Sequence, residues 1–216
     1  MNQFPKFLLF CISLVLSTAS AQVTNTVNKD VAVSITQGLP YVDVQHMGQT
    51  VRIARNQDQN NIIPKIFGKT SRPCPPFCIQ PIKISPEIKS YGELELLNFL
   101  NTEAASGTGL LLDVRMPRFF DAETIPGSIN IPFLLIISNT QDILPLLGAK
   151  KVATGWDFKQ ASTVLIFCNG PWCAQSSRAI NALLGANYPT DKIGYYRGGM
   201  QLWKLFGLNT VGSDIQ

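Results

Sequence analysis

Apolar and polar residues along this chain change their spacing near residue 84. Before that point the clearest pattern is a strict alternation in YVDVQ and TVRIA, on either side of His46-Met47-Gly48-Gln49. Alternation around a short turn is typical of a β-hairpin with one buried face. The polar stretch RNQDQNN that follows predicts a loop, and the four prolines of SRPCPPFCIQP exclude regular structure. The pattern predicts a small β-rich extension with a proline-rich linker.

From residue 84 onward the pattern alternates between helical and strand spacing. Apolar residues at helical intervals predict a helix over about Tyr91 to Asn101. The segment SYGE, which begins at Ser90, has the spacing of a capping box at the start of this helix. The continuous apolar runs LLLDV and TVLIF predict strands buried on both faces. Short strands in IPGSINIP and KIGYY are expected too, with helices in DILPLLG, SRAINALLG and MQLWKLFG. This alternation predicts an α/β domain with a mostly parallel sheet.

The first residues show a third pattern. Lys6 precedes the apolar run FLLFCISLVL, and Ala19-Ser20-Ala21 follows it, an arrangement typical of a cleaved secretory signal. The run is about half as long as a membrane span requires, which disfavours an uncleaved anchor. We therefore expect a periplasmic or secreted protein with no stable membrane anchor. The expected parts are a signal peptide (1–21), the β-rich extension with its linker (22–83) and the α/β domain (84–216).

Charge and histidine content exclude some kinds of site. The net charge is only +4, and no run of basic residues occurs, so nucleic acid is not expected as a partner. His46 is the only histidine, which excludes sites built from several imidazoles. We expect it to be an exposed turn residue, which also disfavours a Cys-His catalytic dyad.

Four cysteines remain once Cys11 leaves with the signal peptide, and they form two close pairs. In CPPFC, prolines stiffen the chain, so we expect Cys74 and Cys78 to form a disulfide that staples the linker. The alternative is that they exchange with the second pair, Cys168 and Cys173 of CNGPWC. A zinc site on all four thiols is disfavoured by their spacing, and neither a metal nor another cofactor is expected.

The second pair lies where a parallel sheet places its ligands. Cys168 directly follows the strand TVLIF, and Ser176 or Ser177 is a suitable N-cap for the next helix. Backbone N–H groups of the intervening loop and the positive end of the helix dipole lower the pKa of a thiol held there. The substrate would then contact the loop residues Asn169, Gly170, Pro171, Trp172 and Ala174.

Four segments in order resemble a rhodanese-like domain over roughly residues 84–208: LLLDVR, IPGSINIP, LIFC with SSRAINALL, and YYRGGMQLW. The resemblance implies a doubly wound sheet with helices on both faces. It also implies that Cys168 takes sulfane sulfur from a small donor as a persulfide and passes it to a thiol or another thiophilic acceptor. Asp113 and Arg115 would help to organise the site, while Gly198, Gly199 and Trp203 would shape the packing beneath it.

The chain departs from that family pattern in three places. Glu123-Thr124 stands where relatives often have Gly-His, a change that we expect to matter little. The segment from Cys168 to the helix is longer than in ordinary sulfurtransferases, which implies a larger pocket. Relatives with enlarged loops that act on phosphate or arsenate carry a loop arginine, whereas Ala174 and Ala179 stand at the corresponding positions here, so phosphatase chemistry is disfavoured.

The third departure is Cys173 itself, which shares the loop with Cys168. It is a candidate to resolve a Cys168 persulfide by forming an intraloop disulfide. Sulfur transfer is the preferred function, and two alternatives stay open. One is a thiol–disulfide oxidoreductase. The other is a non-catalytic domain, stapled by two structural disulfides, that binds a periplasmic protein partner through its N-terminal unit.

Overall fold

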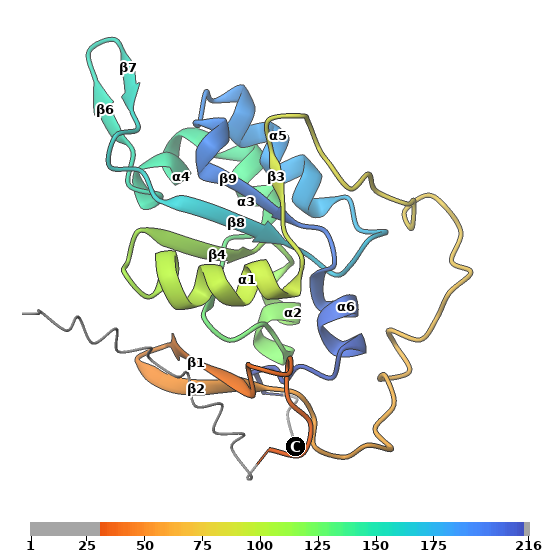
Figure 1. The fold of residues 1–216 in the computed structure, drawn as a ribbon. Coiled ribbons are helices and arrows are strands. Elements are labelled where there is room, and N and C mark those ends of the chain that lie inside the picture. Colours follow the sequence, from red (N-terminus) through yellow and green to blue (C-terminus); the bar gives the residue numbers. More distant parts are fainter. Residues whose placement is uncertain (1–30, 214–216) are drawn as a thin grey trace, which may run out of the picture.

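A parallel sheet of five strands forms the centre of the molecule in the computed structural model, which describes residues 31–213. The expected signal peptide lies outside those residues. The strand order is β3 (Lys89–Ser90), β9 (Ile193–Tyr196), β8 (Thr163–Phe167), β4 (Gly109–Asp113) and β5 (Ser128–Asn130), and each strand pairs in parallel with its neighbour. The strands expected in LLLDV, TVLIF, IPGSINIP and KIGYY are thereby confirmed (Figure 1).

Helices cover both faces of the sheet, because the side chains of each buried strand alternate between two cores. In β8, Val164 and Ile166 pack into one core, and Leu165 and Phe167 pack into the other. The first core holds side chains of α3 (Phe133–Ser138), α4 (Thr140–Leu146) and α5 (Gln175–Gly185). The second holds side chains of α1 (Glu93–Phe99), the π-helical turn η1 (Leu100–Ala104) and α6 (Gly199–Leu205). The sheet is therefore doubly wound, as expected.

The remaining short elements had no clear signal in the sequence. They are α2 (Pro117–Ala122), the antiparallel pair β6 (Lys150–Val152) and β7 (Gly155–Asp157), and the 3-10 turn η2 (Thr190–Lys192). The helix expected from about Tyr91 begins later, at Glu93, with Gly92 as its N-cap. Ser90 belongs to β3, and its hydroxyl donates to the carbonyl oxygen of Ile82. No helix among the described residues is long and apolar enough to cross a membrane.

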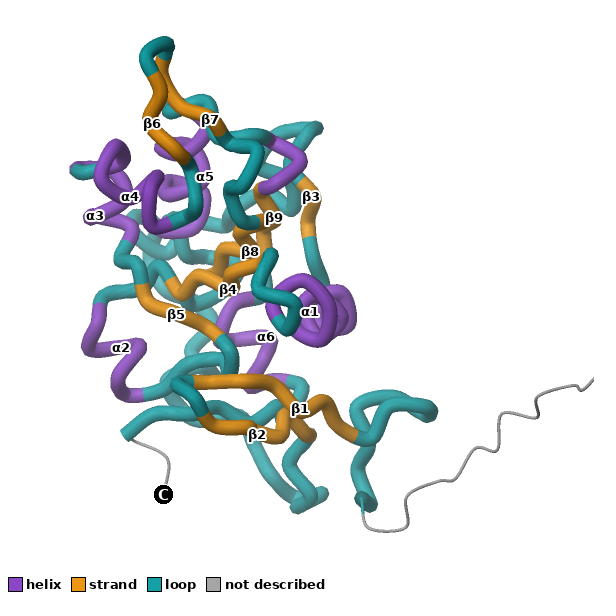
Figure 2. Tube along the Cα trace, turned by 90° about the vertical axis from the view of Figure 1, so that its left-hand side faces the viewer, coloured by secondary structure: helices purple, strands orange, loops and turns teal. Residues whose placement is uncertain are grey.

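The expected N-terminal hairpin is confirmed and packs against the sheet domain. Strands β1 (Tyr41–His46) and β2 (Gln49–Ala54) pair antiparallel across Met47 and Gly48, both with positive φ. The hairpin lies beside the α2 and α6 end of the domain (Figure 2). The expectation that His46 is an exposed turn residue is wrong, because it is the last residue of β1. Instead it is half-buried, and its Nδ1 accepts a hydrogen bond from the N–H of Gly127 at 3.2 Å.

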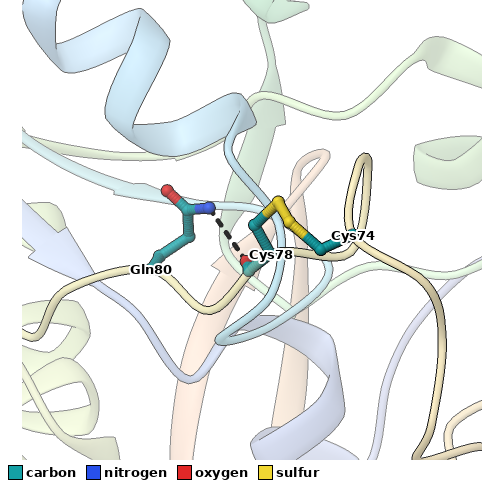
Figure 3. The surroundings of a disulfide bond; sticks show 3 residues. All are labelled: Cys74, Cys78 and Gln80. Carbon is teal, nitrogen blue, oxygen red and sulfur yellow. Dashed lines mark hydrogen bonds between the residues drawn. A yellow bond between two sulfur atoms is a disulfide. The ribbon is translucent and has the colours of Figure 1, made fainter.

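The linker between the hairpin and β3 runs along one side of the domain without a helix or a strand (Figure 1). Within it, Cys74 and Cys78 are joined by a disulfide, with their Cα atoms 4.7 Å apart. The side-chain amide of Gln80 donates to the carbonyl oxygen of Cys78 at 3.0 Å (Figure 3). The linker thus has a defined conformation beside the domain.

Candidate active site

The second cysteine pair lies at the carboxyl end of β8, in a loop that α5 closes. Cys168 is the first residue after the strand, and the helix begins at Gln175. The N-cap is Ala174, so the expectation of Ser176 or Ser177 is wrong by two or three residues. The hydroxyl of Ser177 instead donates to the carbonyl oxygen of Ala174, inside the first turn. The loop therefore consists of residues 169–174.

The N-terminus of α6 is hydrogen-bonded to the start of this loop. Backbone N–H groups of Met200 and Gln201 donate to the carbonyl oxygens of Cys168 and Asn169, at 3.1 and 2.9 Å. This close approach requires Gly199, because its φ is +55° and a Cβ there would overlap the carbonyl oxygen of Cys168. Trp203, one turn further along the helix, is fully buried beneath the sheet. These contacts fix the position of the Cys168 backbone at the end of β8.

The two loop thiols are free, buried and in contact with each other. The Cys168 thiol donates to the carbonyl oxygen of Cys173, with 3.3 Å between sulfur and oxygen. Burial raises the pKa of the Cys168 thiol well above its usual value. The pKa of Cys173 is lowered to about 7, first by a hydrogen bond from Cys168 and then by the backbone N–H groups of Gln175 and Asn169, against the effect of burial. Cys173 is therefore the thiol that ionises near neutral pH.

A cavity of about 950 Å³ opens beside the loop, and one of the two cysteines lines it. Cys173 lines it, whereas Cys168 does not. Of the loop residues expected to contact substrate, Asn169, Trp172 and Ala174 line it as well. The other two support the loop: Gly170 accepts a hydrogen bond from the N–H of Cys173, and Pro171 accepts one from the N–H of Gln80.

Asp113 and Arg115, at the end of β4, form a buried ion pair behind the cavity. The guanidinium contacts both carboxylate oxygens, at 2.6 Å for the shortest pair of atoms, and Arg115 also lines the cavity. The hydroxyl of Thr124 donates to the same carboxylate at 2.8 Å, and Glu123 forms an ion pair with Lys204. The Glu-Thr pair that we expected to matter little is thus part of this network. Its only signal in the sequence was the departure from the family pattern.

The linker supplies a wall of the cavity, which the sequence did not indicate. The ring of Phe77 meets that of Trp172 edge-on, with their centroids 5.0 Å apart. Arg72 lies over both rings, 4.8 Å and 5.0 Å from their centroids. Both Arg72 and Phe77 line the cavity. The disulfide between Cys74 and Cys78 therefore staples a segment that belongs to the candidate site.

The structure distinguishes the bonding state of the two cysteine pairs. Cys74 and Cys78 are bonded to each other, while Cys168 and Cys173 are free thiols in the structure. Within residues 31–213, no three or more His, Cys, Asp or Glu side chains converge in a way that would hold a metal ion.

Comparisons with known proteins match this chain to one family model and to several solved structures. The model of the rhodanese-like domain family matches residues 95–205. Among solved structures, the thiosulfate sulfurtransferase from Pseudomonas aeruginosa is 20% identical with a TM-score of 0.43; the match covers 61% of this chain and 21% of that one. A rhodanese-like domain from Anabaena is 19% identical with a TM-score of 0.41, covering 60% of this chain and 82% of that one. The protein BH2092 from Bacillus halodurans is 18% identical with a TM-score of 0.42, covering 59% and 77%. No curated protein matches the sequence.

Proposed function

The chain belongs to the rhodanese-like family, and on that premise we propose that it is a sulfurtransferase whose loop thiols carry sulfane sulfur. The observation that supports this most directly is a pair of free cysteines at the end of β8, joined by a hydrogen bond from the Cys168 thiol to the carbonyl oxygen of Cys173, and one of them lines a cavity. The family pattern assigns the persulfide to Cys168. Access to the cavity and ionisation favour Cys173 as the first acceptor, with Cys168 behind it. We take this second assignment as the working mechanism.

In the proposed reaction, the Cys173 thiolate attacks the outer sulfur of a donor such as thiosulfate. The sulfur–sulfur bond of the donor breaks, its electron pair leaves with sulfite, and a persulfide remains on Cys173. Backbone N–H groups of Asn169 and Gln175, which stabilise the thiolate, are placed to stabilise the persulfide anion as well. A thiol or cyanide then attacks the terminal sulfur, so that the Cys173 thiolate is regenerated.

The contact between the two thiols favours a second candidate function. Cys168, as a thiolate, can attack the Cys173 sulfur of the persulfide, which releases hydrosulfide and leaves an intraloop disulfide. A protein that cycles through this disulfide without passing sulfur on is a thiol–disulfide oxidoreductase. Export belongs to the proposal as well, and it rests on the sequence of residues 1–21 alone.

The test uses reduced protein with thiosulfate and cyanide, in the wild type and in Cys168→Ser and Cys173→Ser. Thiocyanate is measured, and intact mass shows whether one sulfur atom has been added. We expect Cys173→Ser to lose both signals and Cys168→Ser to keep the adduct. The opposite result assigns the persulfide to Cys168, as the family pattern does. If the wild type shows neither signal, the sulfurtransferase proposal is wrong, and a loop disulfide reduced by mild thiols then supports the oxidoreductase.

A further inference from the structure

The four cysteines of residues 31–213 differ in their exposure to solvent. Cys74 is exposed and Cys78 is half-buried, and a disulfide joins the two in the linker. In the loop, by contrast, Cys173 and Cys168 are only 5% and 3% exposed. A second protein can therefore reach the linker pair directly, whereas the loop pair is enclosed.

Two contacts hold the linker beside the cysteine loop. Phe77 and Trp172 each come directly before a cysteine, and their ring centroids are 5.0 Å apart. The N–H of Gln80 donates to the carbonyl oxygen of Pro171 at 2.8 Å. This hydrogen bond is two residues away from a cysteine in each of the two segments, Cys78 in the linker and Cys173 in the loop. The linker disulfide is thus anchored close to the loop pair along both segments.

The bonding state of the two pairs gives a direction to any exchange between them. The linker pair is bonded, while the loop pair consists of free thiols. Exchange between a dithiol and a disulfide moves two electrons and two protons from the first to the second. A reduced linker that meets an oxidised loop would therefore leave the arrangement that the structure shows.

We propose that the linker pair is a relay that reduces a Cys168–Cys173 disulfide with electrons from an external dithiol protein. That protein first reduces the Cys74–Cys78 disulfide and is itself oxidised to a disulfide. The Cys78 thiolate then attacks the sulfur of Cys173, and the electron pair of the broken bond leaves with Cys168, which takes up a proton. The Cys74 thiolate finally attacks Cys78, which restores the linker disulfide and releases Cys173 as a thiolate.

The relay goes beyond sulfur transfer, because it gives the linker an activity of its own. It rests on the loop disulfide that the second candidate function of this site forms. The intermediate needs the Cα atoms of Cys78 and Cys173 to come within about 4.4 to 6.8 Å of each other. Reduction of the linker opens the ring that the disulfide closes, which frees Cys78 for this approach.

The first experiment traps that intermediate. Cys74→Ser combined with Cys168→Ser leaves Cys78 and Cys173, and Cys78→Ser combined with Cys168→Ser is the matched control that leaves Cys74 and Cys173. Both proteins are equilibrated in a glutathione redox buffer, and peptide mapping by mass spectrometry quantifies the intramolecular disulfide. The Cys78–Cys173 bond should form with an effective concentration on the order of tenfold above that of the control. Equal yields, or no bond between Cys78 and Cys173, overturn the relay.

The second experiment measures the relay in the chain with all its cysteines. Diamide oxidises both pairs, and reduced thioredoxin, a dithiol protein too large for the cavity, is then added. Samples trapped with N-ethylmaleimide at successive times show by peptide mapping which pair carries thiols. In the wild type, linker thiols should appear first and decline as loop thiols accumulate. With Cys74→Ser and Cys78→Ser together, thioredoxin should reduce the loop on the order of tenfold more slowly.

Dithiothreitol is the control reductant, because it is small enough to enter the cavity. It should reduce the loop disulfide of the wild type and of the double variant at similar rates, which shows that the variant keeps its site. Equal rates with thioredoxin in the two proteins overturn the relay, and so does failure of diamide to join the loop cysteines.

A variant that keeps all four of these cysteines tests the contact between the segments. Phe77→Ala removes the ring that meets Trp172 and should slow the relay severalfold. Ile79→Ala is the matched control, because this side chain is in the same linker but 86% exposed and outside the cavity lining. If Phe77→Ala relays as fast as Ile79→Ala, the docking that the relay requires is contradicted.

These measurements separate the relay from the proposed function, because diamide forms the loop disulfide without a sulfur donor. A relay in a protein that produces no thiocyanate contradicts the proposed sulfur transfer alone. Thiocyanate production without electron transfer from the linker to the loop contradicts the relay alone.

Discussion

The two thiols of the loop differ in pKa, because burial dominates at Cys168 whereas hydrogen bonds dominate at Cys173. Burial raises the pKa of Cys168, and the hydrogen bond to Cys173 and the charge on Cys173 raise it further, against the hydrogen bonds to Ser176. Cys173 receives a hydrogen bond from Cys168 and further ones from the backbone, which together outweigh burial. The Cys168 thiol thus lowers the pKa of its neighbour Cys173.

This division predicts the pH dependence of reactivity at Cys173. Its alkylation by iodoacetamide needs the thiolate, so the rate should rise with pH through a midpoint of about 7 and reach a plateau above it. In Cys168→Ala the leading cause of the lowered pKa is gone, and the midpoint should move up towards the ordinary value of about 8.5. Cys168→Ser keeps a hydrogen-bond donor and should give a smaller upward shift.

Cys173→Ser supplies the baseline for that experiment, since Cys168, with its raised pKa, is then the only free cysteine among residues 31–213. An unchanged midpoint in Cys168→Ala would show that the buried thiol does not stabilise its neighbour. The sequence alone predicts the pair and its place at the end of a strand. It does not predict which thiol lines the cavity, because side-chain direction within a loop depends on its backbone path, for which the sequence has no periodic signal.

At the scale of elements, the linker between the hairpin and β3 forms one wall of the candidate site and does more than connect the two parts of the chain. Its contacts join segments far apart in the sequence, such as Phe77 with Trp172 and the N–H of Gln80 with the carbonyl oxygen of Pro171. The carbonyl oxygen of Gln80 accepts a further hydrogen bond from Arg197 at 2.8 Å. The linker thereby holds both the cysteine loop and the chain that enters α6.

Removing the linker disulfide should therefore impair donor binding more than chemistry. In a variant with both Cys74→Ser and Cys78→Ser, the loop thiols are unchanged, so kcat should stay near that of the wild type while KM for the donor rises severalfold. The disulfide closes a short loop, so its removal should lower the free energy of unfolding by roughly 2 kcal/mol at most. Steady-state kinetics and urea unfolding measure the two effects.

Lys69→Gln is a suitable control for that variant, because it changes an exposed linker residue that does not line the cavity. A fall in kcat with KM unchanged would mean that the linker acts on the reacting groups and not on the donor. Either result can be read only if the variant retains the urea unfolding transition of a folded domain.

The elements show where sequence patterns suffice and where tertiary contacts decide. LLLDV and TVLIF are strands because their unbroken apolarity suits burial on both faces, and both were predictable. The N-terminus of α5 was not, because a serine N-cap contributes only about 1 kcal/mol and other contacts outweigh it. Here the side chain of Ser176 is fully buried within the helix, and Ala174 takes the cap. The linker wall was also beyond prediction, since prolines and polar residues give no periodicity that would reveal a distant partner.

At the scale of the whole molecule, the hairpin and the sheet domain share a core. Val42, Val44 and Ile53 of the hairpin belong to the same buried cluster as Trp203 of α6 and Leu165 of β8. Backbone contacts join the two parts as well, since the N–H of Asn56 donates to the carbonyl oxygen of Gly207 at 2.6 Å. The hairpin therefore supports α6, whose N-terminus in turn holds the cysteine loop.

A substitution in the hairpin should accordingly destabilise the entire domain. Ile53 is fully buried, and Ile53→Ala should lower the free energy of unfolding by about 2 to 5 kcal/mol through lost burial and a residual cavity. Because the core is shared, urea should still unfold the variant in a single transition at a lower midpoint, with hydrogen exchange of the β8 amides accelerated in parallel. Gln49→Ala, an exposed position of the same strand, should leave both unchanged. If the hairpin were an independent unit, Ile53→Ala would instead produce an early transition of the hairpin alone, and β8 would keep the exchange rates of the wild type.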